Sequence, residues 1–348
     1  MFEAAQILLD AASMSAVSAA VVPRDGEAWM YGRGIANLES GEVLTPAHQY
    51  DLASLTKVLV TLPEILDLLE ARTWKLDHTL EQFYPQLEGK ALGQATLESL
   101  LTHTSGQHAT RPLHLSAHSR TEVIAQVLEM EPPNSLGHYE YSDLGFILLG
   151  DLLEKQSSEF RGQISGVRRQ NSDLAYPLER LALRRGHVRY LPTGPCVATE
   201  FDSWRGRMVQ GQVHDEKAYA MGGVAGHAGA FGTLEDLIKA ARFWLETSPQ
   251  WLDLMATPRV LEQSGCPRGL GWILGHPTCS GGTLASPQAF GHTGFTGTSF
   301  WVEPGRGYAV ILLTNRVHPT RETTDEIIVL RREFSDVVHR ELGFSSIT

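Results

Sequence analysis

The stretch Leu52-Ala-Ser-Leu-Thr-Lys57 joins a short predicted strand, ending near Leu52, to a predicted helix over residues 58–69. If this stretch opens the helix, Ser54 and Lys57 lie three positions apart on one face, so hydroxyl and amine are neighbours. A serine hydroxyl becomes a nucleophile when a neighbour accepts its proton, and a desolvated lysine can do so. Backbone N–H groups at the helix N-terminus can also stabilise an oxyanion. Alone the motif is weak, because a lysine usually lies on a solvated helix face.

Strand patterns flank this stretch on its N-terminal side and then return only near the end of the chain. Residues 16–22 and 28–35 are strand-like, and Pro23-Arg-Asp-Gly26 between them has the composition of a hairpin turn. Further strands are predicted at 290–292, 298–302 and 308–313. Amphipathic patterns predict a helix at each end of the chain, over 2–12 and about 323–342.

The middle of the chain is predicted to be chiefly helical. The clearest helices cover 148–153 and 234–245, the second with Thr233 and Asp236 as a capping pair. The polar stretch Gln156–Asp173 is predicted to be an exposed loop. This order predicts an α/β (α+β) fold, with one antiparallel sheet built from both chain ends, flanked by helices, and an inserted helical subdomain. We expect a single domain over 1–348, with a sheet subdomain at about 1–60 and 265–348, a helical subdomain at about 61–264, and the site between them.

A second candidate motif is Tyr141-Ser-Asp143, just before an apolar helical pattern. A phenol close to an ammonium group ionises more easily and can pass protons. The alternative is that Tyr141 only packs at a helix start and Asp143 caps that helix. In isolation this structural interpretation is the stronger one.

A third candidate is His292-Thr-Gly294, at the end of a predicted strand. Glycine there would let a ligand backbone approach the strand edge, and His292 or Thr293 could bind a substrate carboxylate. Taken alone, the segment is equally typical of a glycine-rich turn with a surface histidine.

The three motifs together resemble, in order and residue type, those of the serine β-lactamase and D,D-peptidase superfamily, including class C β-lactamases, penicillin-binding proteins and esterase relatives. Other segments are similar as well, from about Ala28 to Leu313, and only 156–190 departs freely. These segments are Leu76-Asp77, Tyr84-Pro85, Leu100-Leu-Thr-His-Thr-Ser-Gly106, Tyr141-Ser-Asp-Leu-Gly-Phe-Ile-Leu-Leu-Gly150 and Gly226-His-Ala-Gly-Ala-Phe-Gly-Thr233.

The resemblance implies roles for individual residues. Ser54 would form an acyl-enzyme, Lys57 and Tyr141 would share the general-base work, and the backbone N–H groups of Ser54 and Phe295 would form the oxyanion hole. It also implies a β-lactamase/transpeptidase-like fold and chemistry that needs no cofactor.

Two departures from the superfamily pattern bear on activity. Asp143 stands where Asn is frequent, and an ionised carboxylate only accepts hydrogen bonds. We infer that it favours a protonated Lys57 and moves the base role toward Tyr141. His292 stands where β-lactamases commonly have Lys, and a histidine is largely uncharged at neutral pH. The sequence therefore predicts that β-lactams acylate the protein slowly, or acylate it and stay.

The segment 205–227 contains further polar residues. Arg205 or Arg207 is a candidate for binding a substrate carboxylate. His214, Asp215 and His227 raise the question of a metal, but their spacing matches no compact ligand motif. We therefore predict no metal site.

Composition narrows the remaining function classes. The chain of 348 residues has a formal net charge of −11, so nucleic acid would be repelled, and no apolar run of about 20 residues predicts a membrane span. No secretory signal is evident, which predicts a cytoplasmic protein, or a periplasmic or secreted one if a leader was removed. Three cysteines favour a reducing compartment, although a Cys266–Cys279 bridge stays open.

These observations predict a serine hydrolase that cleaves an ester, an amide or a D-amino-acid peptide bond, with peptidoglycan fragments as the first substrate class. Its partner would be a small-molecule or peptide substrate, and the sequence gives no oligomeric state. Two alternatives remain: a broad small-acyl carboxylesterase, and a penicillin-binding or sensing protein that acylates once. The second is disfavoured because Ser54, Lys57 and Tyr141 are all present.

Overall fold

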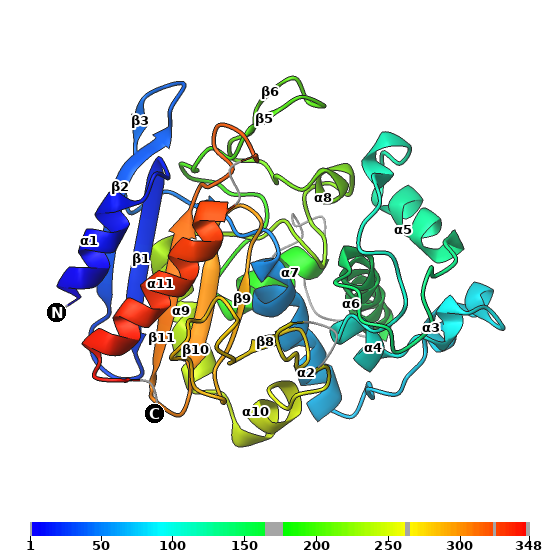
Figure 1. Ribbon diagram of the computed structural model, residues 1–348. Helices are drawn as coiled ribbons and strands as arrows, with labels where there is room; N and C mark the ends of the chain where they lie inside the picture. The colour runs from blue at the N-terminus through cyan, green and yellow to red at the C-terminus, as the bar shows by residue number, and fades with distance from the viewer. Residues whose placement is uncertain (1, 164–176, 262–264, 323–324, 346–348) are drawn as a thin grey trace.

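In the computed structural model, which describes residues 2–163, 177–261, 265–322 and 325–345, a seven-stranded sheet forms one half of the molecule (Figure 1). The strand order is β3-β2-β1-β11-β10-β9-β8, and every neighbouring pair is antiparallel. The strands are β1 (Ala16–Pro23), β2 (Trp29–Asn37), β3 (Glu42–Val43), β8 (Ile273–Leu274), β9 (Phe290–Thr293), β10 (Ser299–Glu303) and β11 (Tyr308–Thr314). The predicted fold, a sheet assembled from both chain ends, is confirmed.

The first and last strands of this sheet are neighbours, because β1 pairs with β11 from Val17↔Thr314 to Pro23↔Tyr308. Alternate side chains of β1 enter two different cores, as the two-residue period of a strand requires. Val17, Ala19 and Val21 pack beneath α1 (Glu3–Ala11) and α11 (Asp325–Glu341). Ala16, Ala20 and Val22 belong to the larger core on the opposite face. Apolar side chains on both faces of β1 therefore place this strand between two layers of helices.

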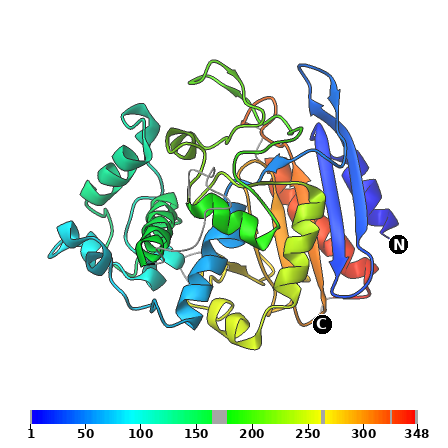
Figure 2. The ribbon, with the colours of Figure 1, turned by 180° about the vertical axis from the view of Figure 1, so that it is seen from behind.

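The two faces of the sheet carry different helices. In Figure 1, α1 and α11 lie over the near face, and Figure 2 shows α9 (Leu234–Leu245) over the other one. The predicted capping pair of α9 is confirmed, since Thr233 Oγ1 accepts from the N–H of Asp236 and the Asp236 carboxylate accepts from that of Thr233, each at 3.1 Å. The expected boundary at residue 264 assigned α9 to the helical part, whereas α9 packs on β1, β10 and β11.

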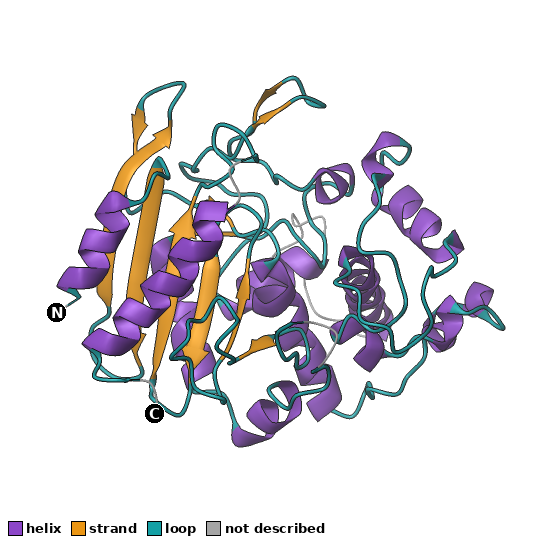
Figure 3. Ribbon diagram, viewed as in Figure 1, coloured by secondary structure: helices purple, strands orange, loops and turns teal. Residues whose placement is uncertain are grey.

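Helices fill the other half of the molecule (Figure 3). They are α2 (Leu62–Glu70), α3 (Leu80–Phe83), α4 (Leu97–Leu101), α5 (Arg120–Glu129), α6 (Asp143–Gln163), α7 (Pro177–Arg185), α8 (Glu216–Ala220) and α10 (Pro249–Met255). Two short ribbons accompany them: β4 (Tyr50–Asp51) pairs with β7 (Phe231–Gly232), and β5 (Phe201–Asp202) pairs with β6 (Arg207–Met208).

The prediction of an exposed loop over Gln156–Asp173 was wrong in its first half, because α6 continues to Gln163. Glu, Lys and Gln are good helix formers, so the polar run beginning at Glu154 continues the helix rather than breaking it. The rest of that stretch, from residue 164, lies outside the described residues.

The cysteines divide into one pair and one free thiol. Cys266 and Cys279 form a disulfide across the segment that contains β8, so the alternative that the sequence left open is the one that the structure has. Cys196 is free and buried. Among the described residues, no helix is both long and apolar enough to cross a membrane.

Candidate active site

Ser54 lies in the tight turn that leads from β4 into the long helix ending with α2. Ala53, directly before it, has a left-handed backbone with φ 46°, held by a hydrogen bond from its N–H to Asp51 Oδ1 at 2.8 Å. An L-residue in this conformation costs about 1–2 kcal/mol, which local contacts must offset. The strained turn places Ser54, partly exposed, at the start of the helix, as the sequence predicted.

Lys57 follows one turn later, and its side chain is fully buried. A π-helical segment, Lys57–Thr61, begins at this residue, and such segments are frequent at functional sites. The ammonium donates to Ser54 Oγ and to Asp143 Oδ1, both at 2.9 Å, and to the backbone carbonyl of His227 at 3.3 Å. Burial lowers the pKa of Lys57, but the charges of Asp143 and then Tyr141 outweigh it, so its pKa lies above the ordinary value. A base would have to be generated from this protonated state.

Tyr141 stands beside the same ammonium, with Lys57 Nζ 5.0 Å from its ring centroid. The ring of His103 lies 4.5 Å from that of Tyr141, and His103 Nδ1 accepts from the backbone N–H of Ser142 at 3.0 Å. Ser142 in turn donates to the carbonyl of His108 at 2.7 Å. The Leu100–Gly106 segment therefore positions the Tyr-Ser-Asp motif, a role that the sequence did not reveal.

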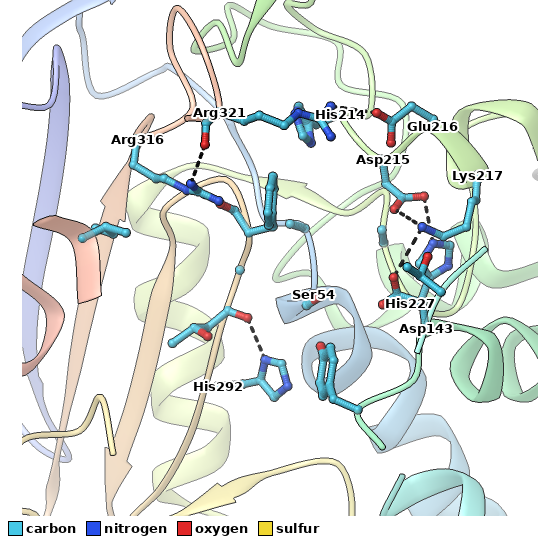
Figure 4. A pocket seen from close by; sticks show the side chains of 18 of the residues that line it. Ser54, Asp143, His214, Asp215, Glu216, Lys217, His227, His292, Arg316 and Arg321 are labelled. Atoms are coloured by element: carbon cyan, nitrogen blue, oxygen red, sulfur yellow. Dashed lines mark hydrogen bonds and ion pairs between the residues drawn. The ribbon is translucent and has the colours of Figure 1, made fainter. Parts of the chain in front are cut away.

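Asp143 begins a chain of charged groups that the sequence analysis missed. Its Oδ2 lies 3.4 Å from the ammonium of Lys217, which also pairs with Asp215 Oδ2 at 2.8 Å (Figure 4). Asp215 Oδ1 contacts His227 Nε2 at 2.9 Å. Burial raises the pKa of Asp143, yet Lys57, His227 and Lys217 together lower it to about 2. Asp143 is thus ionised, and it contacts a second ammonium group, Lys217, in addition to the Lys57 that the sequence considered.

This cluster also bears on the metal question. Ligand atoms of Asp143, Asp215 and His227 come within 4.8 Å of one another. The Lys217 ammonium, however, already contacts both carboxylates and supplies the positive charge that they need. Burial lowers the pKa of Lys217, but Asp215 and Asp143 raise it above its ordinary value, so this ammonium stays charged.

His292 lies on β9, on the opposite side of Ser54 from Asp143 (Figure 4). Its ring is buried, and Nδ1 donates to the carbonyl of Thr293 at 2.8 Å. Burial first, and then the charges of Arg268 and Lys57, lower the pKa of His292 well below its ordinary range. His292 is therefore neutral at pH 7. The sequence predicted a largely uncharged group in place of a charged lysine here, and burial makes the loss of charge more complete.

Gly294 makes a close contact within the protein. A Cβ added there would lie 2.1 Å from Thr298 Oγ1 and 2.5 Å from the carbonyl oxygen of Leu52. Only glycine thus lets this strand end approach the segment that leads into Ser54. Gly294 also lines the cleft, so the expectation that a ligand backbone approaches this strand end stays a prediction.

Phe295 follows Gly294 at the rim of the site. Its half-exposed ring stacks on His214, with centroids 5.6 Å apart, and the Arg316 guanidinium lies 4.2 Å from its centroid. Arg316 Nε also donates to the carbonyl of Phe295 at 2.6 Å. In the described part of the chain, the backbone N–H groups of Ser54 and Phe295 donate to no protein acceptor, as an oxyanion hole requires.

These residues line one cleft with a volume of about 820 Å³. It brings together Ser54, Tyr141, Asp143, His292, Thr293, Gly294 and Phe295, while the buried Lys57 reaches Ser54 from behind.

The two arginines that the sequence proposed for a substrate carboxylate do not line the cleft. Arg205 pairs with Asp202 at 2.7 Å and donates to the carbonyls of Val213 and His214 at 2.7 Å each. Arg207 is exposed and bonds Gln212. Arg205 supports the loop before Asp215, and neither guanidinium faces Ser54.

Arg268, which the sequence analysis did not single out, lines the cleft instead. Its guanidinium lies 5.5 Å from the ring centroid of Tyr141 and 5.7 Å from that of Tyr139. Its Nε and Nη1 are buried without a hydrogen-bond partner among the described residues. Arg268 precedes β8 in an irregular segment, which gave no pattern from which its position could be predicted.

The comparisons with known proteins agree with this geometry. The β-lactamase family model matches residues 5–332. The chain belongs to the β-lactamase family. A curated relative in Escherichia coli K12, a putative D-alanyl-D-alanine carboxypeptidase, is 28% identical over 342 residues, covering 82% of this chain and 74% of that protein.

Two solved structures share the fold. EstCE1, a hydrolase with promiscuous acyltransferase activity, has a TM-score of 0.73 at 16% identity, with 96% of each chain covered. The D-alanine carboxypeptidase AmpC of Burkholderia cenocepacia has a TM-score of 0.67 at 18% identity, also with 96% of each chain covered. Membership of this family makes the protein a β-lactamase-related hydrolase.

Proposed function

We propose that this protein is a serine D,D-carboxypeptidase that forms an acyl-enzyme on Ser54 and releases the terminal D-amino acid of a peptide such as a peptidoglycan fragment. The name of the curated relatives supports this class of substrate. The observation that carries the proposal is the position of Arg268, a cleft cation that contacts Tyr141 and whose buried Nε and Nη1 have no hydrogen-bond partner among the described residues.

The proposed acylation follows from the positions of the groups around Ser54. Ser54 Oγ attacks the scissile carbonyl carbon while its proton passes to the base, and the oxyanion accepts from the N–H groups of Ser54 and Phe295. Because Asp143 favours the protonated form of Lys57, we assign the base role to Tyr141, whose ring lies beside that ammonium. Tyr141 then gives the proton to the departing amine nitrogen. A water molecule, deprotonated by the same group, hydrolyses the ester and restores Ser54.

The carboxylate of the departing residue needs a cation on the strand side of Ser54. His292 is neutral there and cannot form an ion pair, so Arg268 is the group that we assign to this carboxylate. A guanidinium binds a carboxylate through two parallel hydrogen bonds, which an ammonium cannot do. This arrangement supports a substrate with a free terminal carboxylate.

A carboxylesterase acting on small acyl groups is the second candidate. The apolar part of the cleft rim favours it, because Phe295 and Ile328 line the cleft and are each about half exposed. The two candidates differ in whether the substrate must carry a negative charge.

The test compares two substrates in two variants. We expect the protein to release D-alanine from a peptide ending in D-Ala-D-Ala, and Arg268→Met to lower kcat/KM by roughly 10- to 100-fold, the size of a lost charged hydrogen bond. The same variant should retain its rate with neutral p-nitrophenyl acetate. Lys239→Met, which removes a surface cation that pairs with Glu235 on α9, is the matched control and should change neither rate.

Two outcomes would count against the carboxypeptidase. Hydrolysis of the neutral ester without any release of D-alanine would favour the esterase. Equal losses with both substrates in Arg268→Met would show that this arginine only supports Tyr141.

A further inference from the structure

We propose that Lys217 is a positioning residue that shares Asp143 with Lys57 and thereby sets the pH range in which Ser54 is acylated. This inference rests on the part of the proposed function that makes Ser54 the nucleophile. It concerns a residue that contacts neither Ser54 nor Tyr141, so Lys217 would act only through Asp143.

The geometry is a closed ring of alternating charges. Lys57 Nζ bonds Asp143 Oδ1 at 2.9 Å, and Lys217 Nζ lies 3.4 Å from Asp143 Oδ2 and 2.8 Å from Asp215 Oδ2. Asp215 Oδ1 contacts the ring of His227, whose backbone carbonyl accepts from Lys57. Two ammonium groups and two carboxylates therefore balance one another beside the nucleophile.

The ring draws its members from separate elements, so it is a tertiary arrangement. Asp143 is the first residue of α6, and Asp215 caps α8 by accepting from the N–H of Ala218 at 2.8 Å. Burial raises the pKa of both acids, but Lys57, His227 and Lys217 lower that of Asp143, and Lys217 and His227 lower that of Asp215, each below its ordinary value. Both acids are thus held ionised, and the charge of Lys217 is required to offset them.

The other charged or titratable groups near Lys217 make their contacts with residues other than Lys217. Glu216, its neighbour on α8, pairs with Arg321 at 2.7 Å. α5 brings Arg120, which lies 3.8 Å from Glu154, and the segment 113–115 brings His114, whose ring packs on Trp204. The carboxylates within ion-pairing distance of Lys217, in the described ranges, are those of Asp143 and Asp215.

The physical consequence concerns the proton on the base. Without Lys217, the whole charge of Asp143 would act on Lys57, and the cluster would carry one net negative charge. A buried negative charge strengthens proton binding by every group near it, whether Lys57 or Tyr141 is the base. Lys217 therefore keeps acylation possible at lower pH in a site that has Asp143 rather than a neutral amide.

The experiment is a double-mutant cycle of Lys217 and Asp143, in which the pH dependence of the acylation rate is measured. The acylation rate of Ser54 by p-nitrophenyl acetate is measured from about pH 5 to 10 in the wild type, Lys217→Met, Asp143→Asn and the double variant. We expect the acid limb to move up by about 1 to 2 pH units in Lys217→Met, which is the usual effect of one unit charge on a close neighbour. It should move down in Asp143→Asn and return close to the wild-type position in the double variant.

The controls separate charge from shape. Lys217→Arg keeps the charge and should keep the profile, while Lys217→Gln should shift it as Met does; this pair still tests the proposal if the Met variant does not fold. Lys239→Met should leave the profile unchanged. A lower acylation rate in Lys217→Met with an unmoved acid limb would overturn the proposal, as would a double variant that keeps the shift of Lys217→Met.

The ester probe keeps this test apart from the substrate assignment. If peptides ending in D-Ala-D-Ala are not cleaved, the carboxypeptidase proposal fails, and the acylation of Ser54 by the ester still reports on Lys217.

Discussion

The two sides of the cleft balance charge in different ways. On the helix side, Lys57, Asp143, Lys217 and Asp215 contact one another in sequence, and every charge meets an opposite one. On the strand side, His292 is neutral and Arg268 lies against aromatic rings. The charges on the helix side can set the proton affinity of the base without the substrate. The strand side has a cation whose charge a substrate can neutralise.

This difference suggests that the two sides of the cleft have different functions. A balanced buried cluster is rigid and costly to disturb, because removing one member leaves its neighbour's charge uncompensated. A cation without a carboxylate partner selects an anionic ligand through the same electrostatics. Proton transfer and substrate recognition are thus assigned to opposite sides of Ser54, and variants can test the two sides separately.

The largest expected effect comes from removing the nucleophile, Ser54 Oγ, which lies between the two sides of the cleft. Ser54→Ala should lower turnover of any substrate by roughly 10³-fold or more, because the covalent route is lost. Intact-protein mass spectrometry after incubation with an activated phenyl ester should show an adduct in the wild type and none in this variant. A penicillin should give an adduct that forms slowly or persists, since the neutral His292 stands where β-lactamases commonly have a charged lysine. Labelling away from Ser54, or rapid penicillin turnover, would contradict these expectations.

A smaller effect is expected when the strand side is moved away from the nucleophile. Gly294→Ala places a methyl group 2.5 Å from the carbonyl oxygen of Leu52, so the strand end must shift. Overpacking of this kind costs about 1–3 kcal/mol in the free energy of unfolding, measurable by urea denaturation, and acylation should slow as well. Gly305→Ala is the matched control, because a Cβ there meets nothing within 4 Å. Equal stability of the two variants would show that Gly294 is not constrained by packing.

Much of the fold and the nucleophile could be predicted from the sequence, because their signals are local. Short, nearly continuous apolar runs identified β1 and β11, and the capping pair at Thr233 identified the start of α9 at its observed position. Ser54 and Lys57 are three residues apart on one helix, so their contact follows from spacing alone. The resemblance to a known superfamily added Tyr141 and His292, which lie far from them in the chain.

The positions of Lys217 and Arg268 could not be predicted from local sequence signals. Lys217 directly follows Asp215 and Glu216 in the sequence, where a lysine is typical of a solvated surface, and only the fold brings Asp143 to it. Arg268 lies in an irregular segment without periodicity, so nothing in the sequence distinguishes it from Arg205 or Arg207. Contacts between segments more than 70 residues apart determine these roles, and single-sequence patterns do not encode them.

The smallest expected effect tests the neutrality of the strand side through the pH dependence of stability. His292 stays unprotonated in the folded protein, whereas in the unfolded chain it binds a proton below about pH 6.5. The unfolded state therefore gains protons as the pH falls, and the free energy of unfolding decreases below that pH, by up to about 2 kcal/mol per such histidine between pH 6.5 and 5. His292→Asn keeps an N–H donor for the Thr293 carbonyl but does not titrate, so urea unfolding at pH 7 and pH 5 should show a loss smaller by about that amount. His276→Asn, at an exposed position, should leave the loss unchanged. A wild-type pH dependence in His292→Asn would mean that His292 is charged in the folded protein, and this cation would then line the cleft in addition to Arg268.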